Sequence, residues 1–196
     1  MLRILDFLFT VCLINQCPMN VIMNYRFNDT RSGIISALFE LYKRDNALLS
    51  INANERSITH RFAIYIEKEF PGWDVDCEYN RDGEKTKKVE VKTSDGAGDK
   101  KTSAVLPDII VHERGREGRN LLVIEAKKNI SSNKKTERET DKQKICAYIE
   151  DYNYQTGLFI IFNVENRPLS ADLEWYHDKT WRRERIDLEI NVNKVG

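Results

Sequence analysis

Hydrophobic residues recur at helical spacing in three segments of the chain. The first covers about residues 32–43 and has Asp29 or Thr30 as its expected cap, and the second restarts at residues 52–54. The third, about residues 134–152, is highly charged but keeps one apolar stripe. We therefore expect three helices. The residues at helical spacing are Ile34, Ile35, Leu38, Leu41 and Tyr42 in the first segment, Ile58, Phe62, Tyr65, Ile66 and the polar Glu69 in the second, and Ile145, Tyr148, Ile149 and Tyr152 in the third.

Strand-forming patterns lie between these helical segments. Residues 73–79 alternate between polar and apolar side chains. Two apolar runs, residues 105–111 and 121–126, flank a glycine-containing connection and predict a β-hairpin, and residues 157–162 form a strongly apolar strand. Because both faces of these strands are apolar, we expect helices to cover both sides of the sheet.

The element order predicted from these patterns is α-α-β-loop-β-β-α-β followed by a tail. It indicates an α/β fold with a mixed central sheet flanked by helices. The loop, residues 81–103, is polar and glycine-containing, with a short strand expected at 88–92, and the tail has a last expected strand at 186–192. We divide the chain into an apolar N-terminal segment (1–22), a helical appendage (23–50), a core (51–163) and a C-terminal extension that packs on the core (164–196).

The apolar N-terminal segment allows three explanations. It is not part of the native product, with Met19 or Met23 as the start, or it forms an extra packed helix, or it is a targeting segment. Its first 14 residues are fewer than the roughly 20 that a membrane helix requires. We expect no membrane association and a cytoplasmic protein.

Composition narrows the classes of function. Lysine plus arginine and aspartate plus glutamate both number 31, so the net charge is zero. Bulk positive charge therefore does not drive nucleic-acid binding, which would need local basic patches or bound metal ions. The four cysteines form no CxxC pair and have no histidine at zinc spacing, which favours reduced thiols over a zinc site.

The predicted hairpin brings two carboxylates together. If residues 114–119 form its loop, residues that face each other have numbers that sum to about 233, which places Asp108 opposite Glu125. Directly opposed residues have Cβ atoms about 5 Å apart, and like charges at that separation are destabilising. Two carboxylates inside an apolar hairpin need a cation between them.

Mg²⁺ is the natural cation for this pair, because it prefers oxygen ligands and is held by one or two carboxylates plus water and phosphate oxygens. Lys127 follows Glu125 by two residues and therefore projects from the same face of its strand. Its ammonium group would polarise an attacking water or stabilise charge on a phosphate. This set of residues predicts metal-assisted hydrolysis of a phosphodiester, with Mn²⁺ as a substitute for Mg²⁺.

Pro107-Asp108, sixteen intervening residues and then Glu125-Ala126-Lys127 resemble the motif of the PD-(D/E)XK nuclease superfamily. The resemblance implies a restriction endonuclease-like αβββαβ core over about residues 52–163. It also implies that Asp108, Glu125 and the backbone carbonyl of Ala126 bind the metal, while Lys127 orients the nucleophilic water. A further glutamate on the preceding helix is common in this superfamily, and Glu55, one turn before Ile58, occupies that place.

Basic residues of the third helical segment are candidates for contacts with a nucleic acid. The superfamily often places a Gln or Lys of this helix in the site, which implicates Gln143 or Lys144. Residues 127–144 contain seven basic and three acidic side chains, and this excess suits a phosphate backbone. The candidate nucleic-acid contacts are Lys128, Lys134, Lys135, Gln143 and Lys144, with Arg182 and Arg183 in the tail.

We therefore expect a Mg²⁺-dependent nuclease acting on DNA. Two alternatives stay open: a nucleic-acid-binding or assembly module that keeps the fold without cutting, and a phosphodiesterase acting on RNA or a small nucleotide. A nuclease of this size suggests a homodimer, since cutting both strands requires two active sites. The 81–103 loop, the tail or a partner protein would supply any specificity.

Overall fold

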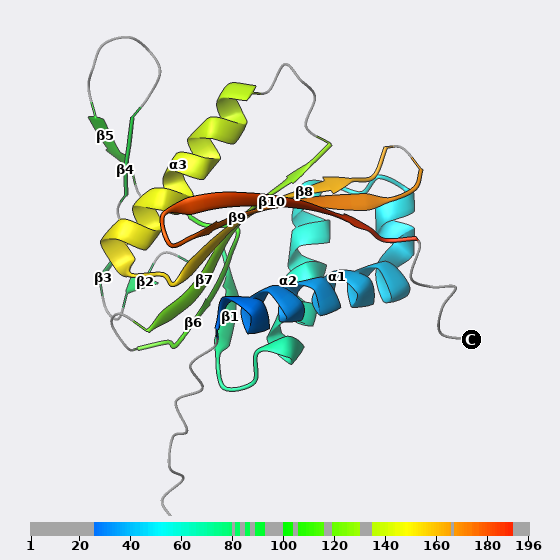
Figure 1. Ribbon diagram of the computed structural model, residues 1–196, viewed down its shortest axis with the longest axis horizontal. Coiled ribbons are helices and arrows are strands. Elements are labelled where there is room, and N and C mark those ends of the chain that lie inside the picture. The colour runs from blue at the N-terminus through cyan, green and yellow to red at the C-terminus, as the bar shows by residue number, and fades with distance from the viewer. Residues whose placement is uncertain are drawn as a thin grey trace, which may run out of the picture.

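The computed structural model describes residues 26–79, 81–82, 85–86, 89–92, 100–103, 106–115, 119–129, 135–165 and 167–189. Within these ranges the chain forms three helices and a six-stranded sheet, with two small hairpins beside it (Figure 1). The apolar N-terminal segment, for which three explanations were open, lies outside the described residues.

The three helices are α1 (Phe27–Ser50), α2 (Glu55–Glu69) and α3 (Lys135–Tyr152), and all three were predicted. α1 begins earlier than its apolar stripe indicates, so the expected cap at Asp29 or Thr30 is wrong. Asp29 lies inside the first turn instead, where its Oδ2 accepts a hydrogen bond from the Arg26 backbone N–H at 3.1 Å. α2 begins behind Asn54, whose side chain accepts a hydrogen bond from Ser57 N–H, as is usual for a helix cap.

The central sheet is mixed, as predicted. Its strands lie in the order β1-β6-β7-β8-β9-β10, and every neighbouring pair is antiparallel except β7 and β8, which are parallel. α3 makes the crossover between these two parallel strands. The strands are β1 (Asp74–Cys77), β6 (Ile109–His112), β7 (Asn120–Lys128), β8 (Thr156–Asn163), β9 (Ser170–His177) and β10 (Thr180–Asp187).

The polar segment between β1 and β6 contains two hairpins, β2 (Arg81–Asp82) with β3 (Lys85–Thr86), and β4 (Val89–Lys92) with β5 (Lys100–Ser103). The short strand expected at 88–92 is confirmed as β4, whereas the three other strands were not predicted. β4 lies alongside α3, at the side of the sheet that this helix covers (Figure 1).

The tail contributes two full strands to the sheet. The strand expected at 186–192 is wrong, because β10 begins at Thr180 and ends at Asp187. β9 and β10 form an antiparallel pair that extends the sheet beyond β8. Charged residues occur along both strands and obscure the apolar alternation from which a strand is normally predicted.

Helices cover both faces of the sheet, as predicted. α1 and α2 pack on one face, where Ile34, Phe62 and Ile124 belong to one apolar cluster. α3 packs on the other face, and its Ile145 and Tyr148 join Val123 in a second cluster. Fully burying a side chain of this size stabilises the fold by about 1.5–3 kcal/mol. From Leu122 to Ala126 the side chains of β7 alternate between the two faces, since Leu122, Ile124 and Ala126 belong to the first cluster and Val123 to the second.

No helix in the described part of the chain is both long and apolar enough to cross a membrane.

Candidate active site

The register of the β6–β7 hairpin agrees with the register deduced from the sequence. Ile109 faces Ile124 and Ile110 faces Val123, so opposed residue numbers sum to 233. Asp108 directly precedes β6 and lies across from Glu125, one position beyond the last paired residues. Its Oδ2 accepts a hydrogen bond from the Ala126 backbone N–H at 2.7 Å. This bond fixes the Asp108 carboxylate against β7.

Glu125 is buried, with 2% of its surface exposed, on the face of β7 that α3 covers. Its Oε1 has no hydrogen-bond partner among the described residues, and its Oε2 lies 4.0 Å from the Lys144 ammonium nitrogen. Burial and the neighbouring Asp108 charge raise the pKa of Glu125 well above the ordinary value. A nearby divalent cation would offset both effects, because it stabilises the ionised carboxylate.

The pKa of Asp108 is raised as well, although its carboxylate accepts a hydrogen bond that stabilises the ionised form. Burial raises the pKa of its carboxyl group, while the Ala126 N–H bond and the Lys127 charge oppose that rise. Two adjacent carboxyl groups therefore both resist ionisation in the protein alone. Such a pair is a frequent mark of a site that binds a cation or handles protons.

Lys127 remains a cation in this environment. Its Nζ lies 3.5 Å from Glu55 Oε1 and 3.5 Å from Asp141 Oδ2. Burial lowers the pKa of Lys127, but the charges of Asp141 and Glu55 outweigh burial, and the net shift is upward. A lysine that stays charged cannot accept a proton as a general base. It can orient a water molecule or stabilise a developing negative charge.

Glu55, the first residue of α2, joins that helix to the end of β7. Its Oε2 accepts a hydrogen bond from the Lys128 backbone N–H at 2.9 Å. The Lys128 ammonium group donates to the backbone carbonyls of Asn52 and Ala53, at 3.1 and 2.7 Å. The Lys128 side chain therefore ties β7 to the α1–α2 connection. These contacts are structural, and the nucleic-acid contact that the sequence suggested for Lys128 stays a prediction.

α3 supplies a buried carboxylate, Asp141, that the sequence analysis did not select. Asp141 is 4% exposed, and its Oδ1 accepts from the Lys144 ammonium group at 2.5 Å. Asp141 thus links Lys144 to Lys127. It precedes Ile145 by four residues and Tyr148 by seven, so helical spacing places it on the buried stripe and would have revealed it.

Two observations show how α3 is oriented over this site. Gly157 of β8 lets the helix approach closely, because a Cβ there would lie 2.1 Å from Ile145 Cγ2. Of the two α3 residues that the sequence left as alternatives, Lys144 is turned toward the site, and Gln143 is exposed to solvent.

Four basic candidates for nucleic-acid contacts remain. Lys134 lies outside the described residues, as does the side chain of Lys135, where α3 begins. Arg182 and Arg183 lie on opposite faces of β10. Arg182 stacks over the Phe27 ring on the α1 face, whereas Arg183 lies 3.5 Å from Asp172 on the α3 face.

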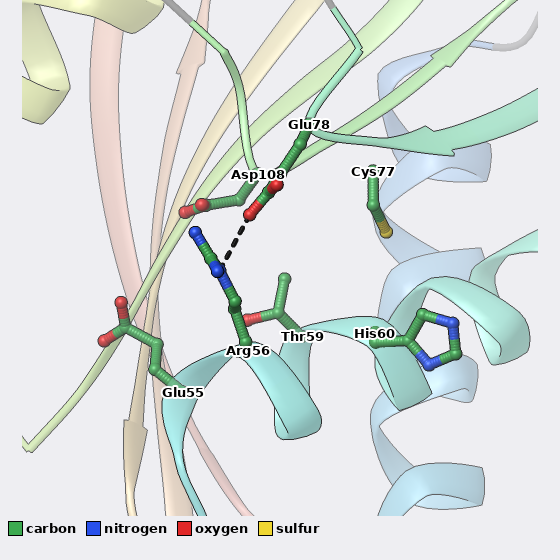
Figure 2. Close-up of a pocket in the computed structure, with 7 residues that line it drawn as sticks. All are labelled: Glu55, Arg56, Thr59, His60, Cys77, Glu78 and Asp108. Carbon is green, nitrogen blue, oxygen red and sulfur yellow. Dashed lines mark ion pairs between the residues drawn. The ribbon is translucent and has the colours of Figure 1, made fainter.

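A cleft of about 410 Å³ opens beside Asp108 and Glu55. Figure 2 shows the carboxylates of both residues extending to the same side of Arg56. Cys77 also lines the cleft, and partial burial together with the charges of Asp76 and Glu78 raises the pKa of its thiol to about 11. The thiol is therefore protonated at neutral pH and is not an activated nucleophile. The other polar side chains that line the cleft are those of Glu78, Arg56, Thr59 and His60.

The described residues contain no group of three or more His, Cys, Asp or Glu side chains arranged to hold a metal. Mg²⁺ does not need such a group, because it retains several waters and uses as few as one or two carboxylates. The buried Glu125 oxygen without a partner, with Asp108 across the hairpin, fits this kind of ligand set.

Comparisons with protein-family models, with curated proteins and with solved structures find no match to this chain.

Proposed function

We propose that the protein is a Mg²⁺-dependent nuclease that hydrolyses phosphodiester bonds in DNA, with a restriction endonuclease-like core. The observation that carries the proposal is the buried Glu125 carboxylate, which has one oxygen without a partner and lies across the hairpin from Asp108. A buried carboxyl group with an unsatisfied oxygen is costly, and its ionised form is more costly still. A divalent cation bound there would offset both costs.

The order of elements supports the proposed type of nuclease. Apart from the two inserted hairpins, α2, β1, β6, β7, α3 and β8 follow one another as α-β-β-β-α-β. This is the order that the PD-(D/E)XK resemblance implies for the core. The positions of the motif residues also support the proposal, because Asp108 directly precedes β6 and Glu125 and Lys127 lie toward the end of β7.

Asp108, Glu125 and the Ala126 carbonyl would hold the cation, which would act as a Lewis acid toward the phosphate oxygens. Lys127 orients the attacking water and stabilises the charge that develops on the phosphate, since it remains protonated between Glu55 and Asp141. Asp141 and Glu55 hold the Lys127 ammonium group in place. Burial under α3 excludes bulk water from Glu125 and Asp141 and strengthens their interactions.

The test is a cleavage assay on supercoiled plasmid, linear duplex DNA, single-stranded DNA and RNA, with Mg²⁺, Mn²⁺ or EDTA. We expect the wild-type protein to cut DNA in either metal and not in EDTA. Asp108→Asn and Lys127→Ala should abolish cutting, because one removes a metal ligand and the other the water-orienting cation.

Lys43→Ala is the matched control for Lys127→Ala. Lys43 lies on α1 with its side chain 72% exposed, and its loss should leave cleavage unchanged. If no nucleic acid is cut, or if Asp108→Asn cuts as fast as wild type, the proposed function is wrong. A DNA-binding measurement on the same proteins would then separate a non-cutting module from an unrelated function.

A further inference from the structure

The cleft beside Asp108 is strongly acidic for a site that receives a phosphodiester. Three carboxylates line it, those of Glu55, Glu78 and Asp108, and Arg56 is the one lining side chain in the described residues that carries a permanent positive charge. A phosphate group entering the cleft would be repelled unless cations offset these charges. A metal at Asp108 and Glu125 supplies one such cation, and Arg56 is placed to supply another.

Arg56 is already engaged in the protein alone, with a carboxylate as its partner. Its Nε lies 2.9 Å from Glu78 Oε1, and the two side chains reach each other from α2 and from the end of β1 across the cleft (Figure 2). The Arg56 side chain is 87% exposed and that of Glu78 is 47% exposed. An ion pair this open to water contributes little stability and is readily exchanged for another anion.

The backbone holds Glu78 in this position. Glu78 has a φ of 50°, in the left-handed region that non-glycine residues rarely adopt, and its N–H donates to the Asp108 carbonyl at 3.3 Å. Such backbone conformations occur often at functional sites. The Glu78 carboxylate is thus held within reach of the Arg56 guanidinium.

A second donor faces the same cleft without a partner. Thr59, one turn after Glu55 on α2, is 6% exposed, and its hydroxyl has no hydrogen-bond partner among the described residues. Thr59 lines the cleft beside Arg56 (Figure 2). Buried hydroxyl groups are normally satisfied, so one without a partner next to a cleft indicates a missing ligand atom.

We propose that Arg56 and Thr59 form a phosphate-binding subsite of the cleft, and that the Glu78 carboxylate occupies Arg56 until a DNA phosphate displaces it. The inference rests on the proposed nuclease function and assigns the residues that bind a backbone phosphate next to the metal. The Arg56 guanidinium binds phosphate oxygens, and the Thr59 hydroxyl donates to the same group. Glu78 returns to Arg56 when the product leaves.

The test is the affinity for a fluorescent duplex oligonucleotide, measured by anisotropy over a range of salt concentrations with Ca²⁺ in place of Mg²⁺. Arg56→Ala should weaken binding by about tenfold, since a charge-assisted contact is lost. It should also reduce the slope of log Kd against log salt by about one phosphate contact. Thr59→Val should weaken binding by about threefold at an unchanged slope, because a hydroxyl group carries no charge.

Glu78→Gln should act in the opposite direction and tighten binding about threefold, because it removes the competing anion and leaves Arg56 available. A merely structural Arg56–Glu78 pair would predict the same sign for both substitutions. This difference in sign keeps the inference testable even if one variant is somewhat less stable.

Arg44 and Glu40 on α1 provide a matched control. They form an exposed ion pair at 2.5 Å, and neither residue lines the cleft. Arg44→Ala and Glu40→Gln make the same changes in net charge, so a general electrostatic effect would appear in these variants too. We expect both to bind DNA as wild type does.

The outcomes separate the inference from the function on which it rests. If wild type binds and cuts DNA but Arg56→Ala and Glu78→Gln match their α1 controls, the subsite is wrong and the nuclease stands. If wild type neither binds nor cuts DNA, both are wrong. Opposite shifts for Arg56→Ala and Glu78→Gln, absent from the controls, support the subsite.

Discussion

Glu125 and Glu174 are two buried glutamates on the same face of the same sheet. Glu125 on β7 pairs in register with Phe159 of β8, and Phe159 pairs with Glu174 of β9. The two residues are 2% and 3% exposed. Each of them therefore places a carboxyl group beneath α3 and out of contact with water.

The protein compensates the two charges very differently. Glu174 meets the Arg138 guanidinium, the Lys142 ammonium group at 3.3 Å and Arg183 Nε at 4.0 Å. Glu125 has its nearest cation, Lys144, at 4.0 Å and one oxygen without a partner among the described residues. Glu174 on β9 therefore has three cationic neighbours, whereas Glu125 on β7 has Lys144 at 4.0 Å.

On the proposed function, this difference distinguishes a structural carboxylate, Glu174, from a functional one, Glu125. Internal cations make Glu174 part of the fold, since it holds α3 and β10 against β9. Glu125 is kept under-compensated, which is expected of a group whose counter-ion comes from outside. The four predictions below test this distinction, and they run from the largest expected effect to the smallest.

Glu125→Gln should reduce the cleavage rate by at least about 10³-fold, because the metal's stabilisation of the transition state is worth several kcal/mol. At pH 4.5, where Glu125 is protonated in the folded protein, the free energy of unfolding in EDTA should change by less than about 1 kcal/mol, because glutamine has nearly the same shape as the neutral carboxyl group. Cleavage kinetics and urea unfolding measure the two quantities. Cleavage at the wild-type rate would show that Glu125 is not part of the active site.

Glu174→Gln should lower the free energy of unfolding by about 3 kcal/mol, because it leaves Arg138 and Lys142 facing a neutral group in a largely buried place. Glu139→Gln on the exposed side of α3 is the control and should stay within about 0.5 kcal/mol of wild type. Urea unfolding of the three proteins measures the difference. If Glu174→Gln loses no more unfolding free energy than the control does, the proposed difference between the two glutamates is wrong.

Stability in EDTA should depend on pH through Glu125. Because burial raises the pKa of Glu125 in the folded protein above the ordinary 4.5, the folded state binds more protons than the unfolded state above that pH. Wild type should therefore lose stability relative to Glu125→Gln as pH rises from 4.5 toward the folded pKa, by up to about 1.4 kcal/mol per pH unit. A difference that is constant with pH would show that Glu125 ionises normally.

Lys144→Ala should slow cleavage by about tenfold, because Lys144 is the nearest cation to Glu125 and binds Asp141. Gln143→Ala should have no effect, because Gln143 is turned to solvent on the same turn of α3. Single-turnover rates with both variants give the comparison. Equal rates for the two variants would mean that the orientation of α3 has no bearing on the chemistry.

The sequence was sufficient for the hairpin and the elements around it. The apolar runs and the loop between them determine which residues face each other, and the sum of 233 is confirmed by Ile109 facing Ile124. Period-two alternation likewise puts Glu125 and Lys127 on one face of β7. These features are local, so a short stretch of sequence contains them.

Features that depend on distant segments were not predicted. The burial of Glu174 relies on Arg138 and Lys142 of α3, and nothing in the sequence of β9 reports those partners. The choice between Gln143 and Lys144 depends on the rotation of α3, which the close contact of Ile145 with Gly157 helps to set. Asp141 was missed although its spacing to Ile145 and Tyr148 contained the signal, because an acidic residue was not expected on a buried stripe.

The most direct test of the central claim is a calorimetric titration of Mg²⁺ into wild type, Glu125→Gln and the exposed control Glu139→Gln. Wild type and Glu139→Gln should bind the ion with equal affinity, and Glu125→Gln should show no binding. If Glu125→Gln binds Mg²⁺ as tightly as wild type does, the buried carboxylate does not serve a metal, and the proposed active site is wrong.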